Sequence, residues 1–185
     1  MKKEIGNRRA RYSKMVIKEA FIDLLEKKAA SKITIKEICE NADVNRATFY
    51  AHYVDQNDLL NKIKDEVIDS INDHIKVISI HDAKSITIIE QIFEYIRKNA
   101  KICKLLLSER GDIVFQKRVL MLVYDMVIHE ITSKNKLSVQ DAEYVYSFLI
   151  TGCIGVIQKW LHDDMKITSK QMAEMLMKIT QKILS

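Results

Sequence analysis

Proline is absent from this chain, and glycine occurs only four times among its 185 residues. Sheets and long loops depend on these two residues for their turns, so their scarcity argues against both. Lysine, glutamate, isoleucine, leucine and methionine are abundant instead, as is typical of helical proteins. Apolar residues make up 48% of the chain, which is enough for a core and argues against disorder. We therefore expect an all-α protein.

Positive charge is concentrated at the start of the chain. Residues 1–36 carry 11 lysines and arginines against 4 acidic residues, whereas residues 37–185 carry 19 against 21. A basic end on a near-neutral body suggests contact with a polyanion, although a basic tail that is merely solvated has the same composition.

The sequence gives no sign of a metal, a cofactor or a membrane segment. Cys39, Cys103 and Cys153 are far apart and form no ligand spacing, so we interpret them as reduced, mostly buried thiols. The N-terminus lacks the apolar stretch of a signal peptide. The most apolar run, Phe148–Ile157, is shorter than the roughly 20 residues that cross a bilayer. We expect a soluble, cytoplasmic protein that needs no cofactor.

Hydrophobic periodicity divides the chain into helices with few gaps between them. The expected helices span about 9–29, 35–41, 45–50, 55–79, 85–99, 101–108, 112–133, 138–163 and 168–184. The first of them has an apolar stripe made of Met15, Ala20, Phe21, Leu24 and Leu25.

The stretch TIKEICENADVNRATFYAHY, Thr34–Tyr53, has the pattern of a helix-turn-helix. A capping box formed by Thr34 and Glu37 starts the first helix, because the two side chains satisfy its first free amides. The bend has no glycine, but Asp43 is one of the few residue types that tolerate a positive φ. Val44 is the apolar residue expected to fix the angle between the two helices.

The second helix of this stretch begins with an almost wholly polar surface. A recognition helix meets base edges with its N-terminal residues. Arginine can bind guanine through two hydrogen bonds, asparagine suits adenine, and an alanine or threonine methyl packs on thymine. The residues expected to face the bases of double-stranded DNA are Asn45, Arg46, Ala47 and Thr48. For Arg46 the alternative is an exposed arginine in a salt bridge.

The segment KITIKEICENADVNRATFYAHYVDQNDLL, residues 32–60, resembles the DNA-binding signature of the TetR family of bacterial transcriptional regulators. The usual pattern is a Thr-initiated helix, then Ala-Gly-Val-Ser, then Thr-Leu/Phe-Tyr-x-His-Phe and Lys-Glu-x-Leu-Leu. Two residues depart from it. Asp43 stands in place of the bend glycine, and Gln56 stands in place of a phosphate-binding lysine.

The resemblance implies that Thr34, Tyr50 and His52 contact DNA phosphates, which positions the protein without reading sequence. Gln56 becomes a weaker contact of the same kind, because it lacks the charge of lysine. For Thr34 a simple helix cap is the alternative, and both roles can hold. The basic residues assigned to the adjacent backbone or minor groove, or else to a solvated arm, are Lys2, Lys3, Arg8, Arg9 and Arg11.

The resemblance also implies an architecture. A three-helix helix-turn-helix head, residues 1–60, is joined by a long helix to a larger helical domain, residues 61–185, that binds an effector and dimerises. We expect a homodimeric repressor that a small molecule releases from a palindromic operator. The segments FEYIRKNAKICKLLL and FLITGCIGVIQKWL are loosely similar to a subgroup that includes the activator of dihydroxyacetone kinase genes. That similarity keeps open an alternative, a co-activator that acts through a protein partner.

The last two expected helices carry the dimer prediction. The helix 138–163 is apolar almost all round, so both of its sides should be covered. The helix 168–184 has two apolar stripes, one for the chain's own core and one for a partner. The family resemblance implies a four-helix bundle made of these helices from both subunits; a single-chain core is the alternative. The predicted interface comprises Gly152, Gly155, Met172, Leu176, Ile179 and Ile183.

Aromatic and methionine side chains in the larger domain form the candidate effector pocket. Residues of these types at helical spacing are also ordinary core, and only the family resemblance favours a pocket. The predicted lining is Phe93, Met121, Tyr124, Tyr146 and Trp160. We expect no enzyme, because the sequence has no glycine-rich phosphate loop, Cys/His pair or clustered carboxylates.

Overall fold

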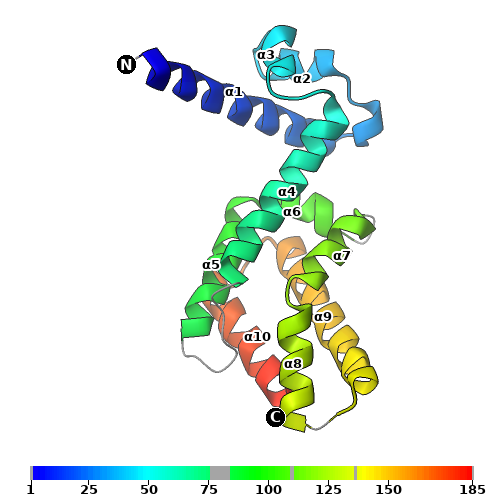
Figure 1. Cartoon of the computed structure of the whole chain (residues 1–185). Helices are drawn as coiled ribbons and strands as arrows, with labels where there is room; N and C mark the ends of the chain where they lie inside the picture. Colours follow the sequence, from blue (N-terminus) through cyan, green and yellow to red (C-terminus); the bar gives the residue numbers. More distant parts are fainter. Residues whose placement is uncertain (1, 76–83, 109–110, 136, 185) are drawn as a thin grey trace. The chain divides into compact units, whose positions relative to one another are not determined.

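The computed structural model describes residues 2–75, 84–108, 111–135 and 137–184, and the side chains of 8–75, 86–108, 111–133 and 137–183 (Figure 1). These ranges hold ten α-helices and one short 3-10 helix, and no strand. The all-α prediction is confirmed.

The chain divides into two compact units, Met1–Val67 and Ile68–Ser185. The division lies inside helix α4, Gln56–Ile75, and the predicted boundary after residue 60 lies in the same helix. The predicted end of this helix, residues 76–79, is outside the described residues. Each unit has its own buried side chains.

The smaller unit contains the first part of α4 and four further elements: α1 (Lys2–Leu25), a 3-10 helix (Ala30–Lys32), α2 (Ile35–Asn41) and α3 (Arg46–Tyr50). Helix α2 contacts α1 and α3, and α3 also contacts α1. The side chains of this unit that are at most 4% exposed are Ile17, Phe21, Ile33, Ile38, Phe49, Tyr53, Leu59, Ile63 and Val67.

Helix α1 differs from its predicted course at both ends. It begins at Lys2, so the arginines that follow are helical, and their contact with DNA or with solvent alone stays a prediction. It ends at Leu25 rather than Ala29, before the chain enters the 3-10 helix. Met15, placed on the predicted apolar stripe, is 45% exposed, and the buried face of this helix comprises Ile17, Ala20, Phe21 and Leu24.

The described part of the larger unit contains the rest of α4 and six further helices: α5 (Lys84–Lys98), α6 (Ala100–Leu107), α7 (Ile113–Met121), α8 (Tyr124–Asn135), α9 (Val139–His162) and α10 (Ser169–Leu184). Helix α10 packs along α5, and α9 contacts both α6 and α8 (Figure 1).

The predicted helix 112–133 is wrong, because the segment forms two helices. Helix α7 ends at Met121 and α8 starts at Tyr124. Between them the Leu122 N–H donates to the Val119 carbonyl oxygen (3.2 Å), three residues back, which interrupts the regular helical ladder. Neither glycine nor proline marks this break, so the sequence carries no local signal for it.

Helix α9 is the one helix among the described residues that is long and apolar enough to cross a membrane by length and composition. It extends on both sides of the shorter apolar run Phe148–Ile157. The core helix of a soluble protein passes the same test. In this structure Ala142 and Leu149 of α9 pack in one cluster with Ile131 of α8. The absence of a membrane partner stays a prediction.

The connection from α9 to α10 is held by one peptide carbonyl. The Ile167 carbonyl oxygen accepts hydrogen bonds from the Trp160 indole N–H and the Arg97 guanidinium, each at 2.9 Å. Arg97 also donates to the hydroxyl of Ser169 (3.2 Å), which is 1% exposed. Because Arg97 belongs to α5, these bonds fix the start of α10 against α5.

Candidate nucleic-acid interface

Helix α2 begins with the predicted capping box. The Glu37 N–H donates to Thr34 Oγ1 (3.3 Å), and the Thr34 N–H and hydroxyl both donate to Glu37 Oε2 (2.9 Å each). Lys28 Nζ lies 2.5 Å from the other carboxylate oxygen. The bond from Lys28, followed by those from Thr34, lowers the pKa of Glu37 to about 2. The Thr34 hydroxyl proton is therefore already bonded, and a phosphate contact requires it to turn away from Glu37.

The turn after α2 has the geometry of a Schellman motif. The Val44 N–H donates to the Cys39 carbonyl oxygen (3.0 Å), and the Asp43 N–H donates to that of Glu40 (3.4 Å). Asp43 has a φ of 50°, so the predicted left-handed residue is confirmed. An aspartate accepts this conformation less readily than glycine, because its Cβ approaches the backbone.

Helix α3 starts one residue later than predicted, because Asn45 is its cap. Asn45 Oδ1 accepts hydrogen bonds from the Thr48 N–H (2.8 Å) and the Thr48 hydroxyl (3.0 Å). An asparagine that pairs with adenine through two bonds needs the same oxygen. Base reading by Asn45 therefore competes with its capping of α3. Thr48 has donated its hydroxyl proton and can offer a base its methyl group or its hydroxyl oxygen as an acceptor.

The outer surface of α3 is exposed and its inner surface is buried. Arg46 and Ala47 are exposed, and Tyr50 is 57% exposed. Phe49 is fully buried, and its ring meets the Tyr50 ring edge-on at 5.7 Å. Among the described residues Arg46 forms no ion pair, so the salt-bridge alternative is not observed. Packing through Phe49 therefore fixes α3 and leaves Arg46 open to solvent at the N-terminal end.

His52 lies in a positively charged environment. Burial, and then the charges of Lys14 and Lys62, lower its pKa, which favours the neutral imidazole, a form that can donate one N–H to phosphate. Lys62 Nζ donates to the His52 carbonyl oxygen (3.1 Å), pairs with Asp58 (2.9 Å) and lies 5.3 Å from the centre of the Tyr53 ring. The sequence reasoning missed Lys14 and Lys62, because only the fold brings charges from α1 and α4 to this histidine.

Gln56 is the first residue of α4, and two carboxylates cap the start of that helix. Asp55 accepts from the N–H groups of Asn57 and Asp58 (2.8 Å each), and Asp58 accepts from the N–H of Val54 (2.9 Å). A helix N-terminus attracts phosphate, whereas the two carboxylates repel it. The phosphate contact of Gln56 stays a prediction.

Four of the five residues predicted to line an effector pocket form two aromatic pairs, and the fifth, Met121, is exposed. Phe93 and Trp160 meet edge to face at 5.3 Å, as do Tyr124 and Tyr146 at 5.0 Å. Burial of Phe93, Tyr146 and Trp160 suits a core as well as a pocket. Met121 is 60% exposed, so within a single chain it does not line an enclosed pocket. The aromatic pocket stays a prediction.

The predicted interface residues on α10 divide between core and surface. Met172 and Leu176 are 2% and 9% exposed within the larger unit, where α10 packs on α5. Their assignment to a partner is therefore wrong for the described chain, because the core already buries them. Ile179 and Ile183 are 44% and 41% exposed and remain available.

Helix α9 presents a wider exposed stripe than the sequence reasoning proposed. Gly152 and Gly155 are exposed, and a Cβ added at either position would meet no atom within 4 Å. Tyr144 and Phe148 precede them on the same face and are 72% and 70% exposed. Helical periodicity does not tell which apolar stripe faces the chain's own core, so Tyr144 and Phe148 were not predicted as interface residues.

Residues 83–182 match a TetR family model described as "Transcriptional regulator C-terminal region". The match spans more than half of the chain and adds to the helix-turn-helix geometry of the smaller unit. The chain belongs to the TetR family of transcriptional regulators. The family predicted from residues 32–60 is thus confirmed by the opposite end of the sequence.

A curated relative of this TetR regulator is the uncharacterized HTH-type transcriptional regulator YxbF of Bacillus subtilis (strain 168), 34% identical over 74 residues. The matched part is 40% of this chain but only 20% of that protein's length. Among solved structures, a TetR transcriptional regulator from Streptococcus agalactiae 2603V has a TM-score of 0.64 at 23% identity, covering 95% of this chain and 97% of its own.

Two further structures share the fold of this TetR regulator. The regulator FadR from Bacillus subtilis, in complex with stearoyl-CoA, has a TM-score of 0.63 at 17% identity, covering 92% of this chain and 97% of its own. The dihydroxyacetone kinase operon activator DhaS has a TM-score of 0.54 at 15% identity, covering 93% and 94%. At such identities the likeness extends to the fold alone.

Proposed function

We propose that this TetR-family chain is a cytoplasmic, homodimeric repressor that binds a palindromic operator and releases it when a small-molecule effector binds. The observation that carries the DNA-binding part is the exposed N-terminal end of α3, at Arg46 and Ala47, on a helix fixed by the buried Phe49. A short, rigid helix whose N-terminal side chains are exposed fits the major groove of double-stranded DNA.

Arg46 is the base reader in this proposal. Its guanidinium is exposed and can bind guanine O6 and N7 together. Tyr50 and the neutral His52 donate hydrogen bonds to phosphates, which sets the register of the protein on DNA. Thr34 and Gln56 add weaker contacts, because the Thr34 hydroxyl is shared with a carboxylate and Gln56 is uncharged.

The exposed stripes of the larger unit support the homodimer. Tyr144, Phe148, Gly152 and Gly155 recur every three or four residues and so lie along one face of α9. On α10 the exposed apolar positions are Met175, Ile179 and Ile183, spaced four residues apart. Contiguous exposed apolar surface is typical of a protein contact. A dimer formed here would hold two α3 helices for half-sites about 34–36 Å apart.

The proposed release of DNA involves a small-molecule effector in the larger unit. FadR from Bacillus subtilis has the same fold and was crystallised with stearoyl-CoA, which makes an organic effector in the larger unit reasonable. An effector shifts the DNA equilibrium only by its differential affinity for the two states, typically about 1–3 kcal/mol. The aromatic residues Phe93, Tyr124, Tyr146 and Trp160 are the candidates for its pocket.

The decisive experiment measures binding and the sign of regulation separately. Selection from randomised duplex DNA should yield an inverted repeat, and fluorescence anisotropy should give saturable binding to it. A reporter under that operator should rise when the gene for this chain is deleted. A fall of the reporter, together with dependence on an added protein partner, would favour the co-activator instead. No selected sequence at all would refute DNA reading by α3.

A further inference from the structure

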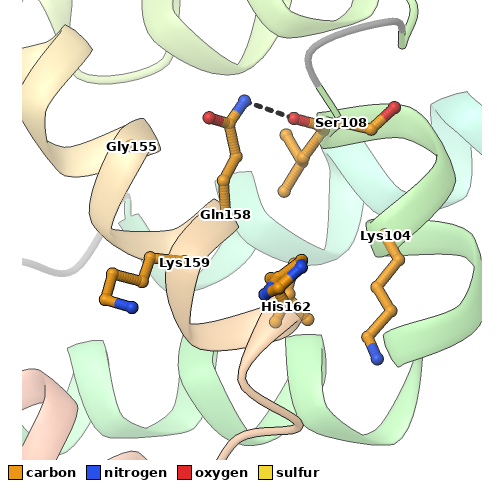
Figure 2. Close-up of a pocket in the computed structure, with 8 residues that line it drawn as sticks. Lys104, Ser108, Gly155, Gln158, Lys159 and His162 are labelled. Atoms are coloured by element: carbon orange, nitrogen blue, oxygen red, sulfur yellow. Dashed lines mark hydrogen bonds between the residues drawn. The ribbon is translucent and has the colours of Figure 1, made fainter.

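A cavity of about 940 Å³ lies between α6 and α9 in the larger unit (Figure 2). Lys104 and Ser108 border it from α6 and its C-terminal cap, and Gln158, Lys159 and His162 border it from α9. None of the residues predicted for an effector pocket is among its lining. Small-molecule sites usually measure about 300–1,000 Å³, so the cavity is large enough for an organic ligand.

The basic side chains of this cavity are paired with two neighbouring aspartates. Lys104 Nζ lies 2.7 Å from Asp164, and Lys159 Nζ lies 2.9 Å from Asp163. His162 Nδ1 is 3.5 Å from Asp163. Lys159 and His162 lower the pKa of Asp163, and Lys104 lowers that of Asp164. The cavity therefore has a positive rim whose present partners are two carboxylates of the chain itself.

These carboxylates belong to a turn with unusual backbone geometry. Asp164 and Met165 have φ values of 53° and 55°. The Met165 N–H donates to the Trp160 carbonyl oxygen (2.8 Å), and the Asp164 N–H donates to that of Leu161 (3.3 Å), which closes a Schellman motif at the end of α9. The Asp164 side chain is 82% exposed, so its pairing with Lys104 is readily exchanged for another anion.

One part of the cavity lining is polar, and another part leaves empty space beside the backbone. Gln158 Nε2 donates to the Leu107 carbonyl oxygen (2.5 Å), a bond visible in Figure 2. Within a single chain, Gly155, which has no side chain and no neighbour within 4 Å of an added Cβ, leaves space beside it. Leu107 and Leu161 supply apolar surface. This combination suits an organic ion with a carbon skeleton better than a hydrated inorganic ion alone.

We infer that the α6–α9 cavity binds a small organic anion, a carboxylate or phosphate, which takes the places of Asp163 and Asp164 on Lys104, Lys159 and His162. The anionic groups bond the two lysines, and the carbon skeleton lies over Leu107 and Leu161. The site is separate from the predicted aromatic pocket. The inferred anion site does not depend on whether binding of the anion releases DNA.

The test uses the full chain and two probes, citrate and inorganic phosphate, in isothermal titration calorimetry at constant ionic strength. Citrate should bind saturably and more tightly than phosphate. Lys104→Gln and Lys159→Gln should each weaken citrate binding at least tenfold, whereas Lys117→Gln, an exposed lysine of α7 outside the cavity, should leave it unchanged. Absence of saturable binding, or equal loss in all three variants, would overturn the inference.

A fourth variant separates this site from general attraction of anions. Asp164→Asn keeps a residue type that tolerates positive φ and removes the carboxylate that competes for Lys104. It should tighten citrate binding severalfold and lower the thermal unfolding midpoint only slightly, because an exposed ion pair contributes little to stability. Asp125→Asn, an exposed acid of α8 outside the lining, is the matched control and should have no effect. Equal tightening in both variants would mean that net charge, and not the cavity, governs binding.

Discussion

The two units of this chain close their helix ends alike, with polar caps such as Thr34 and Ser138, but differ in what their helices expose. In the smaller unit, polar groups close the helix ends: Thr34 caps α2, and Asn45 caps α3. What remains exposed on α3 is mainly Arg46, Ala47 and Tyr50. In the larger unit, α9 and α10 expose aromatic, aliphatic and glycine positions instead.

This difference indicates two kinds of partner. A charged and hydrated surface such as DNA is met best by exposed donors on a rigid frame, which the smaller unit supplies. An apolar stripe gains most from a second apolar stripe, because both leave water together. The proposed function accordingly assigns nucleic acid to one unit and a copy of the chain to the other.

Gly152→Leu should have the largest effect, because it would wedge apart the paired α9 helices. A side chain at this position meets open space in a single chain, so the larger unit should still fold. Loss of the dimer should weaken operator binding by about 10²–10⁴-fold, since the two half-sites are no longer held together. Sedimentation velocity and anisotropy measure both effects, with Lys117→Leu as the control. A dimer that persists in Gly152→Leu would remove α9 from the interface.

Arg46→Ala should weaken specific DNA binding by about 1–3 kcal/mol and relax the preference at one base position. Tyr50→Phe should instead weaken binding to all sequences alike, because it removes only a phosphate contact. Anisotropy on operator variants substituted at each base gives both patterns. If Arg46→Ala left affinity and preference unchanged, α3 would not be the reader.

Asp43→Gly should stabilise the smaller unit by roughly 0.5 kcal/mol. Relief of left-handed strain, about 1–2 kcal/mol for an ordinary residue, exceeds the about 0.5–1 kcal/mol of extra chain entropy that glycine adds. Asp164→Gly makes the same backbone change in the larger unit but also breaks the pair with Lys104. Urea unfolding of both variants measures the change in the free energy of unfolding at each turn. We expect a smaller increase for Asp164→Gly than for Asp43→Gly. Destabilisation by Asp43→Gly would show that its side chain has another role.

Glu37→Gln should have the smallest effect, and only over part of the pH range. The folded pKa of Glu37 is about 2, against an ordinary value of 4.5. Its charged form therefore stabilises α2 above about pH 4.5, and that contribution disappears as the pH falls toward 2. The difference in unfolding midpoint between the natural chain and Glu37→Gln should shrink across this window. A constant difference from pH 7 to pH 2 would contradict the assigned pairing with Lys28.

The smaller unit was predictable because its structure depends on close sequence neighbours. The capping box at Thr34 and the left-handed Asp43 follow from rules that act over three to five residues. The same rules do not decide the role of Asn45, because its type suits both a cap and a base contact, and only the geometry shows that its oxygen caps α3. The start of α1 was missed because a basic, polar segment can be helical without any apolar stripe.

The larger unit was less predictable, because its outcome depends on packing between distant segments. Neither glycine nor proline marks the break in the helix after Met121. Met172 and Ile179 lie on one predicted stripe of α10, yet the first is buried and the second is exposed. The α6–α9 cavity unites Lys104 with Lys159, which are 55 positions apart, and no local pattern connects them.

The single tryptophan of the chain, Trp160, is 3% exposed, and its indole shares the Ile167 carbonyl oxygen with Arg97, whose guanidinium lies 5.2 Å from the ring centre. The two residues that follow it, Leu161 and His162, border the α6–α9 cavity. Trp160 is thus an intrinsic fluorophore. Its emission can be measured without a label, and all tryptophan emission comes from this one residue. Anything that disturbs the α9–α10 connection changes the surroundings of that indole and hence its emission. The smaller unit has no tryptophan, so this signal reports on the larger unit directly.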